Sequence, residues 1–313
     1  MPAPDKLWTV ILQVVFYCLV GVFVVSVALS ADFNQLKHIE WRIDYLVYAA
    51  VTALVFRYIG VTTWINILRH LGCIELPGFA TLSRIYAKAW MGRYIPGKVA
   101  WIVGKVLFGS RYGISVDRLA VGSSLEAILQ IVTSFGFALV LILLDQRLNV
   151  MGAWSVPLLC LVIAGFVIVL IPRCFARLLA FAYRILRREQ AVTIQLTGSL
   201  MLSSVLLYAA GFLVSGLSYY FLINAVYDLS LTNVWFVIAA FNLAGVIGTL
   251  ALFAPSGLGV REGVLLVLLP VLLPVELALL VVVLARLFSL AVDLGFFLIS
   301  HLPLSRWESS VTS

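Results

Sequence analysis

The sequence predicts an all-α polytopic membrane protein, and three observations support this fold class. Hydrophobic residues make up 63% of the 313 residues, whereas charged residues make up only 11%. The mean hydropathy is +1.12, and soluble domains typically contain about 25% charged residues. Apolar runs such as residues 7–29 and 199–226 exceed the roughly 20 residues that a helix needs to cross a bilayer.

The apolar runs, which polar or basic segments separate, predict about seven spanning helices. The first is expected to be retained, because its apolar run is longer than the roughly 7–15 residues of a signal-peptide core. The predicted spans are residues 8–30, 45–68, 119–144, 153–171, 199–225, 234–254 and 276–300.

Two further apolar segments, at about 95–109 and 256–274, are too short to span comfortably. Each begins at a proline and a glycine, so we expect re-entrant or broken helices there. Residues 79–94 and 173–188 each carry cations along one side and apolar residues along the other. This pattern is typical of amphipathic helices that lie in the headgroup plane of a membrane.

Lysine and arginine are unevenly distributed among the loops, and this bias predicts orientation. Loop 69–118 has eight cations against two acids, and loop 172–190 has five against one. The intervening loops carry no excess of cations. We therefore expect a multi-pass protein of the cell inner membrane with a cytoplasmic N-terminus. Re-entry of 256–274 would place the C-terminus on the far side.

The chain is predicted to be a single integral membrane domain, residues 1–313, without a soluble domain. A weak internal similarity relates residues 45–144 to 199–300 and suggests an inverted pseudo-repeat. In each half a long helix precedes a short segment that begins at proline and glycine, and a helix with an acid follows. The four cysteines and three histidines are scattered, so we expect neither a metal nor a cofactor.

Ionisable and polar residues inside the predicted spans need a reason, because a buried charge costs at least about 2.5–3.5 kcal/mol on insertion scales. Ser123, Glu126, Gln130 and Thr133 follow helical spacing and form one polar stripe. Arg286, Ser289 and Asp293 form a second stripe. Arg286 and Asp293 lie about 10 Å apart along the helix, so each is expected to pair with another element. The candidate cavity residues are Arg57, Glu126, Gln130, Asn242, Arg286 and Asp293.

These charges have two interpretations. Buried arginine–acid pairs can simply fix helix packing. Two polar stripes, two broken segments and an excess of cations together favour a cavity with a positive interior, which suits an anionic ligand.

The two short segments carry motifs that suit an anion. A helix that starts near Pro96 and Gly97 presents free N–H groups and the positive end of its dipole beside Lys98. The sequence APSGLGVREG, residues 254–263, has the same features, a proline and glycines at a predicted helix start beside a cation. There Gly257 and Gly259 would let the backbone approach a ligand, Arg261 supplies charge, and Glu262 is expected to hold Arg261 or Arg286 or to take a proton.

The stretches MGRYIPGKVAWIVGKVLFGSRYGIS and APSGLGVREGVLL resemble the paired signatures of the lysylphosphatidylglycerol synthase transmembrane-region family. This family is also described as the flippase-like domain of the multiple peptide resistance factor, and the resemblance covers nearly the whole chain. It implies re-entrant helices around a lipid-sized cavity and movement of an anionic or polyprenyl-linked lipid between leaflets. The residues that match the motifs, and are implied to bind substrate, are Arg93, Tyr94, Pro96, Gly97, Lys98, Pro255, Gly257, Gly259, Arg261 and Glu262.

Longer relatives carry a soluble aminoacyl-transfer domain after the membrane region, and this chain stops at Ser313, so the resemblance does not imply lipid synthesis. The leading hypothesis is a lipid flippase that is not an enzyme. One alternative is a membrane-embedded enzyme or subunit that acts on a polyprenyl phosphate, with Glu126, Glu262 or Asp293 as acid or base. Another is a non-transporting partner of a glycosyltransferase. The expected partners are a lipid substrate, the membrane and either a glycosyltransferase or a second copy, but no nucleic acid.

Overall fold

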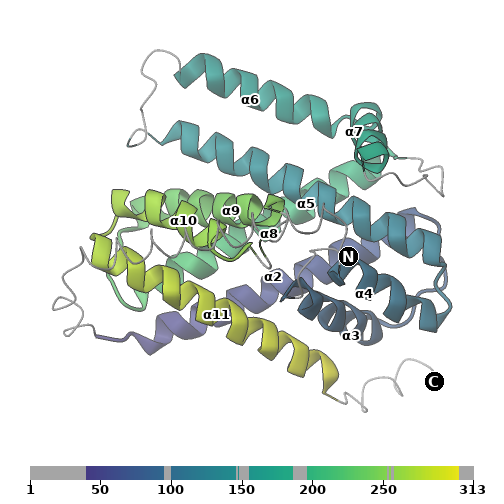
Figure 1. Ribbon diagram of the computed structural model, residues 1–313, viewed down its shortest axis with the longest axis horizontal. Helices are drawn as coiled ribbons and strands as arrows, with labels where there is room; N and C mark the ends of the chain where they lie inside the picture. The colour runs from purple at the N-terminus through teal and green to yellow at the C-terminus, as the bar shows by residue number, and fades with distance from the viewer. Residues whose placement is uncertain are drawn as a thin grey trace, which may run out of the picture.

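The computed structural model describes residues 40–94, 100–145, 147, 155–185, 196–251, 254 and 257–302, and all regular secondary structure within them is helical. Among these residues, five helices are long and apolar enough to cross a membrane. They are α2 (Ile43–His70), α5 (Val116–Leu144), α8 (Gly198–Asn224), α9 (Val234–Leu250, extended by the turn η6, Leu231–Asn233) and α11 (Val275–His301) (Figure 1).

These five helices confirm the predicted fold class and lie within a few residues of five predicted spans. The helix α6 (Ser155–Leu170) occupies a sixth predicted span but has only 16 residues. The predicted span at 8–30 lies outside the described residues. The total of seven spans therefore stays a prediction.

The first short segment forms part of a helical hairpin. The helix α3 (Phe79–Trp90) continues into the turn η2 (Met91–Tyr94), and α4 (Ala100–Gly109) packs back against α3. The two backbones approach closely at Gly104, where a Cβ atom would lie 3.1 Å from Ala89. At 1.5 Å per residue α4 is about 15 Å long, so it cannot cross a hydrocarbon core of about 30 Å.

The second short segment is also a short helix. The helix α10 (Val260–Leu268) has nine residues, is followed by the turn η8 (Leu269–Val271), and packs against both α9 and α11. The helix described in each of the two segments predicted to be broken or re-entrant is thus too short to span. The inverted pseudo-repeat stays a prediction.

The amphipathic helix α3 differs from its predicted placement. Its apolar face, which includes Leu82, Ile85 and Tyr86, is buried against α2, α4 and α11. The apolar stripe was expected to contact lipid, but the neighbouring helices cover it because the hairpin folds into the protein. The second predicted amphipathic segment forms the helix α7 (Pro172–Ile185), and its position in the headgroup plane stays a prediction.

The packing of the helices places α11 in a bridging position. The helix α2 packs along α8, and α9 packs against α5 and α8, whereas α6 lies at one edge beside α5 (Figure 1). The helix α11 contacts α10 near its beginning and α3 further along, so it connects the two regions of short helices (Figure 1). The polar stripe on α11 therefore faces both regions.

Candidate functional site

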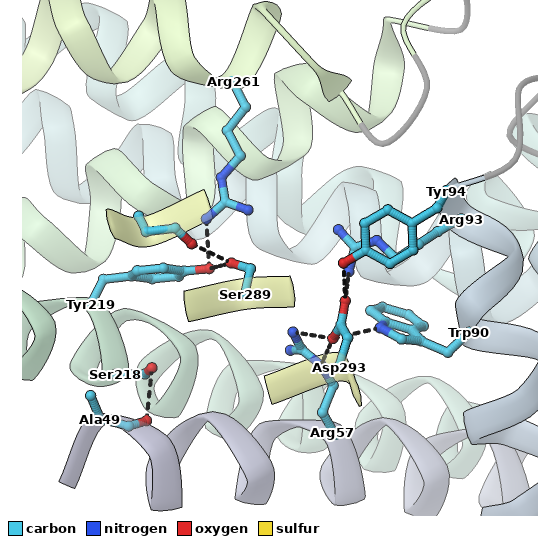
Figure 2. A network of polar contacts seen from close by, with 11 residues as sticks. Ala49, Arg57, Trp90, Arg93, Tyr94, Ser218, Tyr219, Arg261, Ser289 and Asp293 are labelled. Atoms are coloured by element: carbon cyan, nitrogen blue, oxygen red, sulfur yellow. Dashed lines mark hydrogen bonds and ion pairs between the residues drawn. The ribbon is translucent and has the colours of Figure 1, made fainter. Parts of the chain in front are cut away.

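Asp293 of α11 is the centre of a buried polar cluster, and its side chain is fully buried. Its Oδ1 accepts a hydrogen bond from Arg57 Nε of α2 at 2.7 Å and one from Trp90 Nε1 of α3 at 3.0 Å. Its Oδ2 accepts one from the Tyr94 hydroxyl at 2.6 Å, and Arg93 Nη1 lies 3.6 Å away (Figure 2). We call Asp293 with Arg57, Trp90, Arg93 and Tyr94 the aspartate hub.

The aspartate hub satisfies the prediction that Asp293 pairs outside its own helix. The three hub residues from the α3–η2 segment reach across to α11, and Arg57 reaches it from α2. The Trp90 ring lies next to both arginines, with Arg93 Cζ 4.7 Å and Arg57 Cζ 5.4 Å from its centroid. These cation–π contacts hold the guanidinium groups in place without neutralising them.

Arg261 of α10 belongs to a second polar group. This group reaches α11 at Ser289, about one helical turn before Asp293. Arg261 Nη2 donates a hydrogen bond to the Tyr219 hydroxyl of α8 at 2.6 Å, and that hydroxyl lies 2.9 Å from Ser289 Oγ (Figure 2). The Tyr219 ring stacks on Phe241, with centroids 4.2 Å apart. Among the described residues, Arg261 thus has a neutral hydroxyl as its hydrogen-bond partner and no carboxylate within salt-bridge distance.

Positive charge exceeds negative charge around α11. Arg57 and Arg93 both lie within 4 Å of Asp293, and Arg261 is joined through Tyr219 to Ser289, four residues before Asp293 on α11. Arg286 Nη1 lies 3.7 Å from Glu262 Oε1, which matches one of the three roles that the sequence left open for Glu262. Within the described part of the chain, Arg57 and Arg93 share the Asp293 carboxylate and Arg261 has no carboxylate within salt-bridge distance, so these three arginines exceed their carboxylates by two positive charges.

The beginning of α10 differs from the predicted open anion site. The Glu262 carboxylate accepts a hydrogen bond at 2.7 Å from the N–H of Gly259, so the chain's own carboxylate already occupies this helix start. Gly257 and Gly259 have φ of +68° and +83°, and a Cβ on Gly257 would lie 2.8 Å from Gly248 Cα. Backbone geometry and packing against α9 explain these glycines. Their approach to a ligand stays a prediction.

A second ion pair lies apart from the aspartate hub. Lys105 of α4 and Glu126 of α5 form a salt bridge, with side chains 0% and 1% exposed. The Tyr86 hydroxyl donates to Glu126 Oε1 at 2.9 Å. The sequence placed Lys105 in a cationic loop, but the structure buries it because α4 turns inward against α5.

Two hollows separate these polar groups. The first lies between the two ion pairs and is lined by Phe56, Arg57, Ile59, Gly60, Tyr86, Trp90, Glu126, Gln130, Tyr208 and Gly211. The second lies between Arg57 and Tyr219. Their enclosed volumes are about 20 Å³ and about 10 Å³. Ligand pockets typically measure about 300–1,000 Å³, so neither hollow is the lipid-sized cavity that the resemblance implied.

The remaining predicted residues have different positions. Gln130 lines the first hollow, together with Glu126 of the same predicted stripe. The Asn242 amide donates to the carbonyls of Phe212 and Ile238, so it joins α9 to α8 instead of lining a described hollow. Pro96, Gly97, Lys98 and Pro255 lie outside the described residues.

The aromatic side chains that form hydrogen bonds with the buried charges were not predicted from the sequence. Trp90, Tyr86 and Tyr219 each donate to or accept from a charged or polar partner in the interior. Tyr86 and Trp90 stand one helical turn apart on the buried face of α3, so their spacing was a usable signal. Within the part of the chain that is described, no three His, Cys, Asp or Glu side chains lie close enough to hold a metal ion.

The fold and this site define a polytopic α-helical membrane protein with arginines gathered inside it. Comparison with protein families identifies it further. The chain belongs to the family described as the lysylphosphatidylglycerol synthase TM region, whose model matches residues 10–295. None of the curated proteins compared with the chain is similar enough to count as a match.

Proposed function

We propose that the protein is a lipid translocator, which moves an anionic phospholipid or a polyprenyl-phosphate lipid between the leaflets of the cell inner membrane. The observation that supports this is the excess of arginines around α11, at the point where the two regions of short helices meet. A buried charge without an opposite charge is unfavourable. An anionic headgroup would supply the missing negative charge.

The arginines are chemically suited to a phosphate. A guanidinium group offers planar, paired N–H donors that match phosphate oxygens. Arg93 has 26% of its side chain exposed and lies 3.6 Å from Asp293, a distance too long for a strong hydrogen bond. Arg93 is therefore the cation of the aspartate hub that is best placed to exchange its partner for a headgroup.

Translocation as proposed requires the helices to separate, because the hollows are smaller than a lipid. The short helices α4 and α10 are the natural moving parts, since neither crosses the bilayer. We propose that the protein carries out no covalent chemistry and that its N-terminus is cytoplasmic, as its basic loops predict.

The test is lipid movement in liposomes that contain the purified full chain. Acyl-labelled phosphatidylglycerol and acyl-labelled phosphatidylcholine are compared by reduction of the label from outside. We expect phosphatidylglycerol to cross faster than phosphatidylcholine. Arg93→Gln should slow phosphatidylglycerol about tenfold or more, since one charge-assisted hydrogen bond contributes about 1.5–3 kcal/mol.

Lys88→Gln is the matched control. Lys88 is an exposed cation of α3, the helix that leads to Arg93, and its Nζ lies over the Phe108 ring, away from the hub. This variant should retain the rate of the unmodified chain. Rates equal to those of protein-free liposomes for both lipids would reject the proposed function.

A further inference from the structure

The Lys105–Glu126 pair has a feature that the aspartate hub lacks, because both of its members can change charge. An arginine stays protonated throughout the physiological range, whereas glutamate and lysine can each exist in a neutral form. Both side chains are buried, so a change of charge there is not screened by water. The pair is therefore suited to sense protons, and the Arg57–Asp293 pair is not.

Residues of four neighbouring helices surround Glu126. Lys105 faces it from α4, and the Tyr86 hydroxyl donates to it from α3. Tyr208 of α8 donates to the backbone carbonyl of Glu126 at 2.9 Å, and Arg57 of α2 faces it across the first hollow. A single acid thus faces one lysine, one arginine and two tyrosines.

The first hollow connects Glu126 to the aspartate hub. It has room for about one or two water molecules, and a buried water needs two to four polar partners. Arg57, Gln130 and the Tyr86 hydroxyl line the hollow together with Glu126. Water in this position would carry a proton to or from the carboxylate, and Glu126 shares the hollow with a hub arginine.

We propose that Glu126 is a proton-binding site whose occupancy is coupled to binding of the anionic lipid. The inference rests on the proposed function. A proton from water forms an O–H bond with the Glu126 carboxylate, and the Lys105–Glu126 pair changes from neutral to a single positive charge. The interior beside the arginines then holds one more positive charge, which strengthens binding of an anion. By thermodynamic reciprocity, anion binding favours uptake of the proton to the same extent.

Protonation of Glu126 and binding of the lipid should favour each other, so the affinity for the lipid should depend on pH. Affinity for an anionic lipid should rise as pH falls, by at most about tenfold per pH unit for one linked proton. The direct test is calorimetric titration of the detergent-solubilised full chain with dioctanoylphosphatidylglycerol, in buffers of different ionisation enthalpy at equal pH. Uptake of up to about one proton per bound lipid is expected for the unmodified chain.

Two variants separate the proton site from the folding role of the pair. Glu126→Gln removes the titrating group but leaves Lys105 without its anion. Lys105→Met/Glu126→Gln removes both charges and keeps the volume. The double variant should bind dioctanoylphosphatidylglycerol without proton uptake and without the pH dependence, whereas in Glu126→Gln the remaining Lys105 can still exchange a proton. Uptake that persists in the folded double variant would overturn the inference.

Infrared difference spectra assign the proton within the pair. As pH falls, the carbonyl stretch of a protonated carboxyl should appear in the unmodified chain and be absent from Glu126→Gln. If proton uptake occurs without this band, the proton binds elsewhere and Glu126 is not the site.

A liposome experiment distinguishes this inference from the proposed function. An imposed pH gradient should change the rate of phosphatidylglycerol translocation several-fold in the unmodified chain and not in the double variant. Translocation that ignores the gradient would reject proton coupling and leave the translocator function intact. Lipid binding with proton uptake but no translocation would support the proton site and reject the translocator.

Discussion

The two buried ion pairs place similar groups in different settings. At the aspartate hub, one carboxylate is shared by two arginines, a tryptophan and a tyrosine, and Arg93 remains 26% exposed. In the Lys105–Glu126 pair, one carboxylate meets one lysine, and both side chains are almost completely buried. The hub is rich in fixed positive charge, whereas the pair is neutral and can titrate.

This difference shows why a buried charge in a membrane protein cannot be interpreted from its residue type alone. Arg57 and Lys105 are both buried cations beside an acid. The Arg57 charge is permanent, so it suits attraction of an anion, whereas the Lys105–Glu126 pair can gain or lose charge, so it suits coupling.

Asp293→Asn should have the largest effect, because it leaves Arg57 buried without its anion. The expected loss in the free energy of unfolding is about 3–5 kcal/mol, measured by thermal unfolding of the detergent-purified chain. Arg57→Met/Asp293→Leu removes Asp293 together with the nearer of its two arginines, and it should recover part of this loss. A single variant as stable as the unmodified chain would show that the hub is not held by its aspartate.

Glu126→Gln should destabilise the chain by about 3 kcal/mol, at the lower end of that range, because glutamine still accepts the Tyr86 hydrogen bond and lysine can shed its proton. Lys105→Met/Glu126→Gln should return to within about 1.5 kcal/mol of the unmodified chain. Chemical unfolding of the two variants gives the comparison. Equal instability of both would mean that Lys105 packs α4 through its contacts with Trp64, Tyr86 and Trp101 instead of its charge.

Gly257→Ala tests whether backbone geometry positions the Arg261 side of the site. The positive φ and the 2.8 Å approach to Gly248 predict a loss of about 1–3 kcal/mol. Gly263→Ala is the matched control on α10, since a Cβ there meets no atom within 4 Å, and it should be neutral or slightly stabilising. Thermal unfolding of the two variants decides, and equal midpoints would contradict the prediction.

Tyr219→Phe removes the hydroxyl between Arg261 and Ser289. We expect a loss of about 1 kcal/mol in stability together with slower translocation of phosphatidylglycerol. Tyr220→Phe is a control at the next position, because the Tyr220 hydroxyl donates to the Leu229 carbonyl at 2.8 Å, away from the site. It should show a similar stability loss without the change in translocation. Identical translocation in the two variants would remove Tyr219 from the site.

Asp228→Asn should have the smallest effect. Arg42 Nη1 and Asp228 Oδ1 are 2.8 Å apart, but the Asp228 side chain is 86% exposed. Exposed ion pairs contribute about 0–1 kcal/mol. Stability and translocation should both stay close to those of the unmodified chain, and a large loss in either would show that surface pairs matter as much as buried ones.

The sequence predicted several parts of the site correctly. The spacing of Ser123, Glu126, Gln130 and Thr133 indicated one polar stripe that faces away from lipid. Three of these side chains are buried, and Gln130 lines the first hollow. The distance between Arg286 and Asp293 indicated separate partners, and the structure supplies Glu262 and Arg57. These predictions succeeded because they depend only on the period of a helix and on the need of a buried charge for a partner.

Other parts were not predictable from local pattern. Lys105 was counted as a loop cation because its neighbours in the sequence include several other cations, and only the fold of α4 against α5 brings it to Glu126. Tyr219 lies in an apolar span without any motif, yet its hydroxyl completes the polar group around Arg261.

The sequence alone thus determined the membrane class, the long helices, the two short segments and the presence of charges that need partners, because helical period and hydropathy are local properties. The tertiary structure decided which charges meet. It placed two arginines on Asp293 and one lysine on Glu126, and it put the Glu262 carboxylate at the start of α10. The physical reason is that electrostatic pairing depends on distance in space, and helix packing brings residues as far apart in sequence as Arg57 and Asp293 to 2.7 Å.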